Sequence, residues 1–241
     1  FKSGYIIWSK VKESQTLKER SAFMSQYKKR SVREVEKMAN ITSVDYEAIP
    51  SQAKQMRAEA QQLNSEMTKA YTSIENMHNS WYGVRYNELQ KAFNNLIPSL
   101  NEMLTLVVKE IPFALETVAN NYSLADKGTK VTSAINDGPK PITALTITSD
   151  VGMKFITADV EATQKSVETN FENSKEQMNK IESIYNGIDW KSEAATAFKS
   201  QFTKLKNEIV NSFENLKADF AKLMNETKSD IQATESANTV E

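Results

Sequence analysis

The 241-residue chain has no cysteine and only one histidine, His78, which excludes disulfides, thiolate zinc sites, cysteine nucleophiles and paired-histidine metal sites. Its six glycines and five prolines are well under half of the usual share of roughly 12%, so there is little turn chemistry for a many-stranded sheet. The glycines never lie closer than ten residues apart, which excludes a glycine-rich phosphate loop. No run of about 18 apolar residues and no cleavable leader is visible. These absences favour long helices in a non-enzymatic protein with no cofactor, no metal and no stable membrane insertion.

Charge is balanced over the whole chain but uneven along it. The formal net charge is -1, yet residues 1–40 carry ten Lys/Arg against four Asp/Glu. This basic segment is not expected to bind nucleic acid, because the remaining residues are acidic overall. Since the chain begins at Phe1 and Met24 precedes a fresh polar segment, residues 1–23 are expected to be an artificial extension or the cut edge of a longer protein. The segment from Ser9 to Lys37 is a candidate for an additional N-terminal helix.

An internal repeat organises the rest of the chain. Trp81 and Trp190 stand 109 residues apart, and each is followed by apolar residues at the same eight offsets. The first set is Leu89, Phe93, Leu96, Leu100, Leu104, Val107, Ile111 and Leu115, and the second is Phe198, Phe202, Leu205, Ile209, Phe213, Leu216, Phe220 and Met224. Steps of three and four residues are typical of the apolar stripe of an amphipathic helix. A long helix is therefore predicted after each tryptophan.

The same rhythm precedes each tryptophan, so each copy is predicted to be a helical hairpin. The stripe before Trp81 is Leu63, Met67, Ala70, Ile74 and Met77, and the one before Trp190 is Val167, Phe171, Ser174, Met178, Ile181 and Ile184. The predicted helices span about 51–80, 84–125, 154–187 and 191–232. A lone hairpin cannot bury these stripes, whereas two hairpins can cover one another. The prediction is an all-α fold in which hairpins 41–126 and 153–235 pack antiparallel as an elongated four-helix bundle, followed by a disordered tail at 236–241.

Breaker residues mark a linker and two helix distortions. Residues 127–152 include an Asn-Asp-Gly-Pro-Lys-Pro run, the densest cluster of such residues in the chain, and are predicted to be an extended tether. The β-branched portion Ile142 to Thr148 could instead pair locally as a strand. Pro98 and Pro112 lie inside a predicted helix, where each removes a donor and crowds the preceding turn, so both are expected to produce kinks.

The residues at the first turn resemble a known family. Trp81-Tyr82-Gly83 between two long stripes is similar to the WXG family, the early-secretory-antigenic-target type of helical hairpins exported by bacterial type VII secretion systems. The resemblance covers about residues 41–126 and again 153–235. The second copy departs from the pattern, because Trp190 is followed by Lys191 and Ser192 rather than by a glycine at the third position. Ser192 can cap a helix, and Gly187 can supply a positive φ if the chain reversal needs one.

The resemblance also implies an export signal. Family members carry a tyrosine followed four residues later by an acidic residue after the second helix, and Tyr122 with Asp126 fits that position. The same spacing occurs at Tyr71 with Glu75 and at Tyr185 with Asp189, which do not follow a second helix. The second copy has no tyrosine after Tyr185 and lacks the signal. The tryptophans are either core-capping residues or residues recognised directly, and both roles can hold together.

The family resemblance implies a function by binding rather than by catalysis. In family heterodimers one partner brings the Tyr/Asp tail beside the Trp turn of the other, so this chain looks like a fused, monomeric pseudo-heterodimer in which Tyr122 and Asp126 meet Trp190. It would be a substrate or effector that the type VII secretion ATPase recognises and exports folded, to the medium or cell surface. A co-secreted WXG protein or toxin is a further candidate partner.

Two alternatives stay open. One is an α-helical pore-forming toxin component, although its most apolar stretch, Leu104 to Leu115, is interrupted by charges and Pro112. The other is an adaptor or chaperone for a separate toxin.

Overall fold

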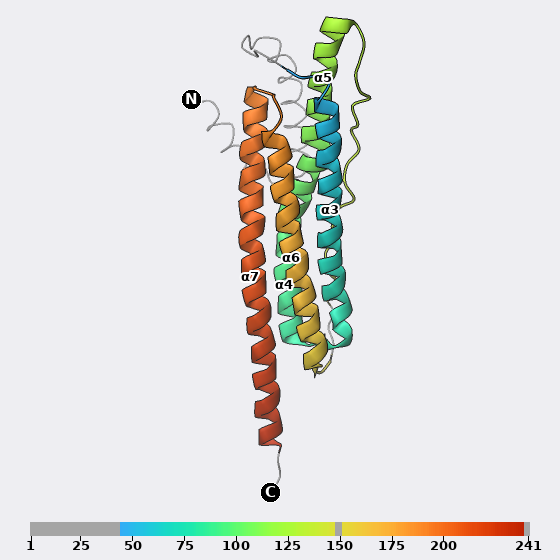
Figure 1. The fold of residues 1–241 in the computed structure, drawn as a ribbon. Coiled ribbons are helices and arrows are strands. Elements are labelled where there is room, and N and C mark those ends of the chain that lie inside the picture. Colours follow the sequence, from blue (N-terminus) through green and yellow to red (C-terminus); the bar gives the residue numbers. More distant parts are fainter. Residues whose placement is uncertain (1–43, 148–150, 239–241) are drawn as a thin grey trace, which may run out of the picture. The chain divides into compact units, whose positions relative to one another are not determined.

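The computed structural model describes residues 44–147 and 151–238, and helices dominate them (Figure 1). Along the chain the elements are α3 (Ile49–Asn76), the 3-10 turn η1 (Met77–Asn79), β1 (Trp81–Tyr82), α4 (Val84–Thr105), the π-helical segment η2 (Leu106–Glu110), α5 (Ile111–Lys127), β2 (Lys154–Phe155), α6 (Thr157–Asn186) and α7 (Glu193–Ala237). The all-α prediction with two helical hairpins is confirmed. The predicted N-terminal helix between Ser9 and Lys37 lies outside the described residues.

The chain divides into two compact units. The first includes Trp190–Ala197, and the second comprises Val44–Asp189 and Phe198–Glu241. The following description of packing concerns the second unit. At the far end of the chain, α7 continues to Ala237, so residues 236 and 237, predicted to belong to a disordered tail, are helical. The Ser236 hydroxyl still donates to the carbonyl of Gln232 inside this helix (2.8 Å).

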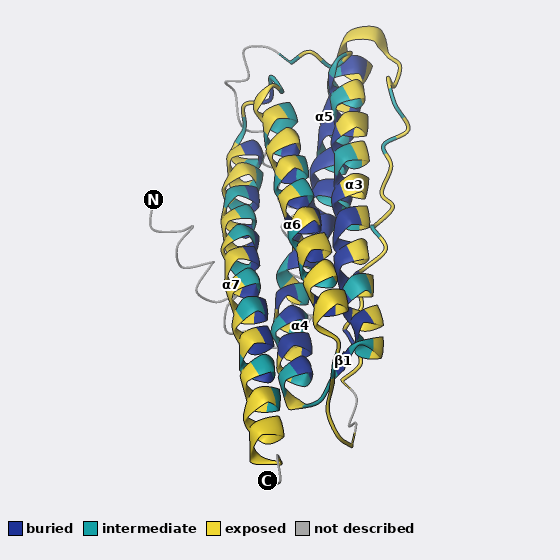
Figure 2. Cartoon of the chain, turned by 60° about the horizontal axis from the view of Figure 1, so that its bottom comes forward, coloured by how far each residue is buried: buried dark blue, intermediate teal, exposed yellow. Residues whose placement is uncertain are grey.

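The repeated stripes form the core. Of the sixteen apolar positions that follow the two tryptophans, fifteen are buried, and only Phe198 is partly exposed. In Figure 2 the buried residues line the inner faces of the helices, while the outer faces of α6 and α7 are exposed. Aromatic rings connect the two hairpins: the Phe171 ring of α6 lies 5.9 Å from Phe93 of α4, and it also stacks on Phe213 of its own hairpin with centroids 4.3 Å apart. Burial of these stripes is the main favourable term in assembling the hairpins.

The hairpins pack antiparallel, as their shared contacts show. Along α3, contacts to α6 run from Gln52 with the Gly187 carbonyl (3.3 Å), through Met67 Sδ with Ser174 Oγ (3.2 Å), to Ser80 with Asp159 (2.8 Å). Residue numbers thus rise in α3 as they fall in α6. The partners α4 and α7 follow the same rule, since Gln201 contacts Glu102 and Glu226 contacts Arg85.

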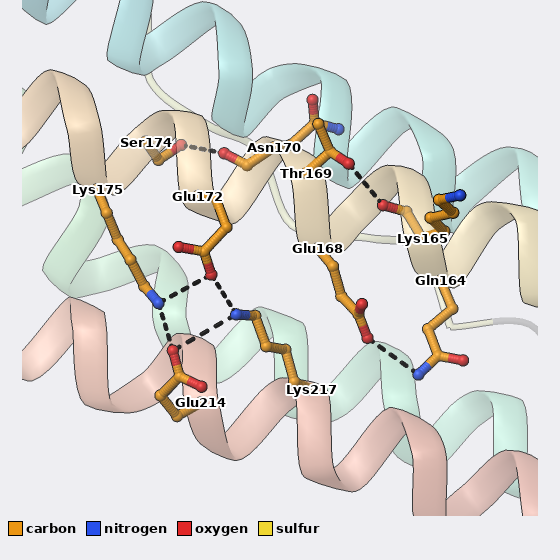
Figure 3. Close-up of polar contacts among 10 residues, drawn as sticks. All are labelled: Gln164, Lys165, Glu168, Thr169, Asn170, Glu172, Ser174, Lys175, Glu214 and Lys217. Carbon is orange, nitrogen blue, oxygen red and sulfur yellow. Dashed lines mark hydrogen bonds and ion pairs between the residues drawn. The ribbon is translucent and has the colours of Figure 1, made fainter.

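Ion pairs link α7 to α6 on the outside of the bundle, and we call this row of pairs the charged seam. Glu172 of α6 accepts hydrogen bonds from Lys175 and from Lys217 of α7, and Glu214 of α7 accepts from the same two lysines (Figure 3). The pKa of each of these glutamates is held below its usual value, chiefly by a lysine hydrogen bond, from Lys217 for Glu172 and from Lys175 for Glu214. Two further lysine–glutamate pairs continue this seam, Lys206 with Glu182 (2.5 Å) and Lys228 with Glu161 (2.7 Å).

The prolines act differently from one another. α4 continues through Pro98 without interruption, whereas the helix changes to the π-helical segment η2 immediately before α5, which has Pro112 in its first turn. Pro112 has no N–H to donate to the carbonyl of Val108, four residues earlier. Arg57 of α3 supplies a donor instead, because its Nε lies 3.1 Å from the Val108 oxygen.

The Arg57 guanidinium also forms a buried ion pair. Its two terminal nitrogens bind both carboxylate oxygens of Glu116 on α5, and the two side chains are only 11% and 4% exposed. One of these nitrogens also donates to the carbonyl of Ile135 (2.7 Å), whose N–H donates back to Glu116 (2.7 Å). A single arginine thus joins α3, the proline-distorted helix and the segment that follows it.

That segment, residues 129–147, is extended but is not a free tether; we call it the strap. Figures 1 and 2 show it beside α3 and α5, on the side away from α7. Polar side chains of α4 and α5 bind its backbone in antiparallel order: Ser123 to Thr129, Asn120 to Val131 and Thr132, Glu116 to Ile135, Asn101 to Ile142, Asn94 to Leu145 and Gln90 to Thr146. Ile142 and Leu145 are buried against the helices, at 6% exposure each. The segment is extended, as predicted for the linker, and these helix faces supply the hydrogen bonds that water would otherwise make.

Removing one partner of the buried ion pair should be costly. Arg57→Met leaves Glu116 charged and buried and deprives the Val108 carbonyl of a donor, so we expect a loss of about 3–5 kcal/mol in the free energy of unfolding. Urea denaturation of the full chain measures it. Lys69→Met is the matched control, since Lys69 is 60% exposed and its pair with Glu66 should contribute about 0–1 kcal/mol. Equal losses of stability for the two substitutions would contradict the stabilising role of the buried Arg57–Glu116 pair.

The seam between α6 and α7 should weaken in acid. A lowered pKa means that Glu172 and Glu214 contribute their full stabilisation above their ordinary pKa and lose it as the pH falls through the lowered values. Lys175→Met/Lys217→Met should therefore cost roughly 0.2–1 kcal/mol per pair at neutral pH and progressively less below about pH 4.5.

Urea denaturation at several pH values measures this difference. Lys180→Met is the control, because the ion pair of Lys180 is with Glu176 inside α6 and not with α7. A difference between the double variant and the unaltered chain that stays constant from pH 7 to pH 3 would show that the four charges do not stabilise the seam.

Candidate functional site: the tail of the first hairpin and the two tryptophan turns

The first tryptophan turn is enclosed by aromatic rings. α3 ends in η1, and the chain then passes through β1 to Gly83, which precedes α4 at φ 122° and ψ -172°. Trp81 is only 1% exposed, and its ring lies 5.4 Å from Phe155 and 6.0 Å from both Tyr86 and Phe220. Phe155 and Phe220 come from the second half of the chain, so this indole is part of the contact between the hairpins.

The entry to the second hairpin is attached to the same turn. β1 pairs antiparallel with β2, placing Trp81 opposite Phe155 and Tyr82 opposite Lys154. The amide of Ile156 donates to the Ser80 carbonyl (2.8 Å). A side chain on Gly83 would be close to this entry segment, because an added Cβ would lie 3.4 Å from the Gly152 oxygen. The Trp-x-Gly turn therefore has a structural role: it fixes where α6 begins.

The second tryptophan turn is built differently. Gly187 caps α6 with φ -81°, so the positive φ that the sequence suggested for it is not used. Its amide donates to the carbonyls of Ser183 and Ile184 (both 3.1 Å). Ser192 Oγ accepts from the Ala195 amide (3.0 Å), which is the helix-capping contact expected of this serine. Trp190 is 7% exposed and belongs to the first unit.

The tail of the first hairpin is the last turn of α5. Tyr122 is partly exposed and Asp126 is exposed, one helical turn apart on the same face. The helix ends at Lys127, where Gly128 adopts a left-handed φ of 69° and its amide donates to the Leu124 carbonyl (3.1 Å). This places a tyrosine and a carboxylate at an accessible helix end, where another protein can bind them.

Residues from the start of the hairpin hold this tail in place. The Tyr46 hydroxyl donates to Asp126 Oδ2, and that carboxylate raises the pKa of the tyrosine. Glu47 pairs with Lys127, whose Nζ also lies 5.4 Å from the centre of the Tyr46 ring. Sequence reasoning missed Tyr46 and Glu47. The predicted hairpin could have pointed to them. Its two arms run antiparallel, so the residues just before α3 lie beside the end of α5.

The structure separates the three tyrosine–acid pairs. Tyr71 is buried with its hydroxyl 2.6 Å from the Phe93 carbonyl, and burial raises its pKa, so this pair cannot serve as a surface signal. Burial also raises the pKa of Tyr185. Trp81 lies at the far end of the first hairpin from Tyr122 and Asp126, separated from them by the length of α4 and α5. Because Trp190 belongs to the other unit, its meeting with Tyr122 and Asp126 stays a prediction.

The described residues hold no group of three or more His, Cys, Asp or Glu side chains placed to bind a metal ion. The His78 ring lies near two tyrosine rings, 5.9 Å from Tyr82 and 5.8 Å from Tyr86. Within 44–147 and 151–238, none of the helices combines the length and the apolar character needed to cross a membrane.

Gly83 should be sensitive to any side chain. Its backbone conformation is essentially restricted to glycine, and an added Cβ would meet the Gly152 oxygen. We expect Gly83→Ala to lower the free energy of unfolding by about 1–3 kcal/mol. Gly138→Ala is the matched control, since nothing lies within 4 Å of its added Cβ. Thermal and urea unfolding compare the two, and an unaffected Gly83→Ala variant would disprove the strain.

Comparison with known proteins gave one family match. The model of the family WXG100, described as proteins of 100 residues with WXG, matches residues 41–127. No curated protein and no solved structure matched the chain. The matched range begins just before Tyr46, includes Trp81 and Gly83, and ends at Lys127, directly after the tail residues. The match does not extend to residues 153–235, so a second copy of the family rests on the repeated stripe alone. The family match therefore supports a WXG100-type protein, and it does so through the first hairpin.

Proposed function

We propose that the protein is a non-enzymatic substrate of a bacterial type VII secretion system, exported to the medium or the cell surface. The observation that carries the proposal is the WXG100 match over residues 41–127, which ends on an accessible tail with Tyr122 and Asp126. The secretion ATPase is the proposed partner that reads this tail. A co-secreted WXG protein or toxin is a further proposed partner.

The second hairpin takes the place of a separate partner subunit in this proposal. Its antiparallel packing on the first hairpin supports that role, because the stripes of both are buried against each other. The second hairpin has no tyrosine after Tyr185 and so cannot carry a tail signal of its own. It contributes the Trp190 turn to a bipartite signal, and a single chain acts as a pseudo-heterodimer. Linking the halves makes their association intramolecular and independent of protein concentration.

The tail is suited to recognition as a folded element. Tyr46 and Glu47 hold the side chains of Asp126 and Lys127, so the last turn of α5 is fixed before any partner binds. A preordered helix end costs less to bind than a disordered peptide does. The proposed ATPase contact is therefore with a folded helix end, and export of the folded chain follows.

Tyr122→Ala should abolish export without unfolding the chain. Tyr122 is only partly buried, so its removal should change the free energy of unfolding by less than about 1 kcal/mol. The measurement is the amount of protein in the medium and in the cells of a bacterium whose type VII system exports the unaltered chain. Tyr82→Ala is the matched control: it removes another partly exposed tyrosine, at the opposite end of the hairpin, and should leave export unchanged.

Two results would contradict the proposal. Normal export of Tyr122→Ala would show that this tail is not the signal. Equal export of the unaltered chain from cells with and without the secretion ATPase would show that the protein is not a type VII substrate.

A further inference from the structure

The strap occupies a groove that the first hairpin forms without help from the second. α4 and α5 supply one wall through their asparagine and glutamine side chains. α3 supplies the other, since Asn64 Nδ2 donates to the Lys140 carbonyl (3.0 Å) and Arg57 binds the Ile135 carbonyl. The second hairpin packs elsewhere, because α7 lies on the opposite side of α3 and α5 (Figures 1 and 2).

The groove binds the strap through its backbone N–H and C=O groups. Asn101 Nδ2 donates to the Ile142 carbonyl (3.0 Å), and its Oδ1 accepts from the amide of the same residue (2.8 Å). Asn94 makes the same two bonds to Leu145, at 3.0 and 2.8 Å. Each asparagine thereby replaces a neighbouring strand, offering one donor and one acceptor to one extended residue. None of these bonds depends on the identity of the strap residue.

Two apolar positions supply the selectivity. Ile142 and Leu145 are buried, while Thr143 and Ala144 between them are exposed. The groove therefore requires an extended segment with aliphatic side chains three residues apart and with free N–H and C=O groups at those two positions. Such recognition combines main-chain hydrogen bonds with a few side-chain pockets, as in peptide binding by strand addition.

We propose that this groove is a peptide-binding site that accepts an extended segment of a partner protein with this pattern, and that the strap is its resident occupant. The inference does not rest on export, since it concerns a different surface of the first hairpin. The strap competes at an effective concentration in the millimolar range, as expected for a ligand on the same chain. A partner segment therefore binds when the strap leaves the groove, and the closed form is the resting state.

The test uses a synthetic, fluorescein-labelled peptide with the sequence of residues 139–147. It is titrated against the full chain carrying Ile142→Ser/Leu145→Ser, which weakens the chain's own strap but leaves the groove intact. Fluorescence anisotropy should show binding at least tenfold tighter than to the unaltered chain, whose strap competes. Adding Asn94→Ala/Asn101→Ala to the opened variant should weaken binding at least tenfold, because four backbone contacts are lost.

Backbone methylation distinguishes binding at this site from nonspecific hydrophobic binding. A peptide N-methylated at the residues matching Ile142 and Leu145 keeps both side chains but cannot donate to the asparagines, so we expect at least a tenfold loss of affinity. A peptide methylated at the residue matching Thr143 is the control and should bind as the parent does. Equal binding of all three peptides, or no binding to the opened variant, would overturn the proposal.

A second measurement covers the case in which the opened variant fails to fold, as judged by circular dichroism. Unlabelled peptide is added at millimolar concentration to the unaltered, isotopically labelled chain, where it competes with the strap on equal terms. The backbone amide signals of Ile142 and Leu145 in the strap should shift in a saturable way as the strap is displaced, and the side-chain amide signals of Asn173, which contacts Glu66 away from the groove, should not. Unchanged Ile142 and Leu145 signals would also overturn the proposal.

Discussion

An amphipathic hairpin cannot cover its own apolar stripes, and the rest of this structure depends on how that surface is buried. Each hairpin uses the other: Phe171 stacks on Phe93, and Trp81 is closed off by Phe155 and Phe220. The geometry of the Trp81 turn is thus inseparable from the second hairpin, which begins beside it through the β1–β2 pair. Burying these stripes fixes the register of the hairpins, and the charged seam between α6 and α7 then forms between side chains already brought close.

A second constraint is that buried backbone N–H and C=O groups must have hydrogen-bond partners. The polar side chains inside the first hairpin supply them. Pro112 deprives the Val108 carbonyl of its α-helical donor, and Arg57 provides one. Arg57 in turn needs a counter-charge, which Glu116 supplies, and both bind Ile135 of the strap. The strap has no sheet to join, so helix side chains pair with its backbone instead. Helix distortion, ion pair and strap are therefore one connected network.

The sequence predicted the features that follow from local periodicity. Steps of three and four placed the helix stripes, and Ser192 was recognised as a cap. It did not reveal Asn94, Asn101 or Asn120, because an asparagine on a helix looks the same whether water or a strap covers it. Their partners lie 11 to 51 residues away in sequence. Two features of the sequence could have indicated these contacts. One is the polar stripe with helical spacing, and the other is the pair of isolated aliphatic residues, Ile142 and Leu145, in a segment rich in helix-breaking residues.

The two hairpins share a stripe but not their polar surfaces. Positions 109 residues after Asn94, Asn101 and Asn120 hold Thr203, Val210 and Ser229, so α7 does not repeat the asparagine ladder. The strap groove and the Tyr122–Asp126 tail both belong to the first hairpin, and they adjoin. The strap begins one residue after Gly128, and its first bonds are to Ser123 and Asn120, inside the last turns of α5. Any change that lifts the strap from this end removes contacts from the helix that carries the tail. The first hairpin thus holds both proposed recognition surfaces, and they meet at the last turns of α5.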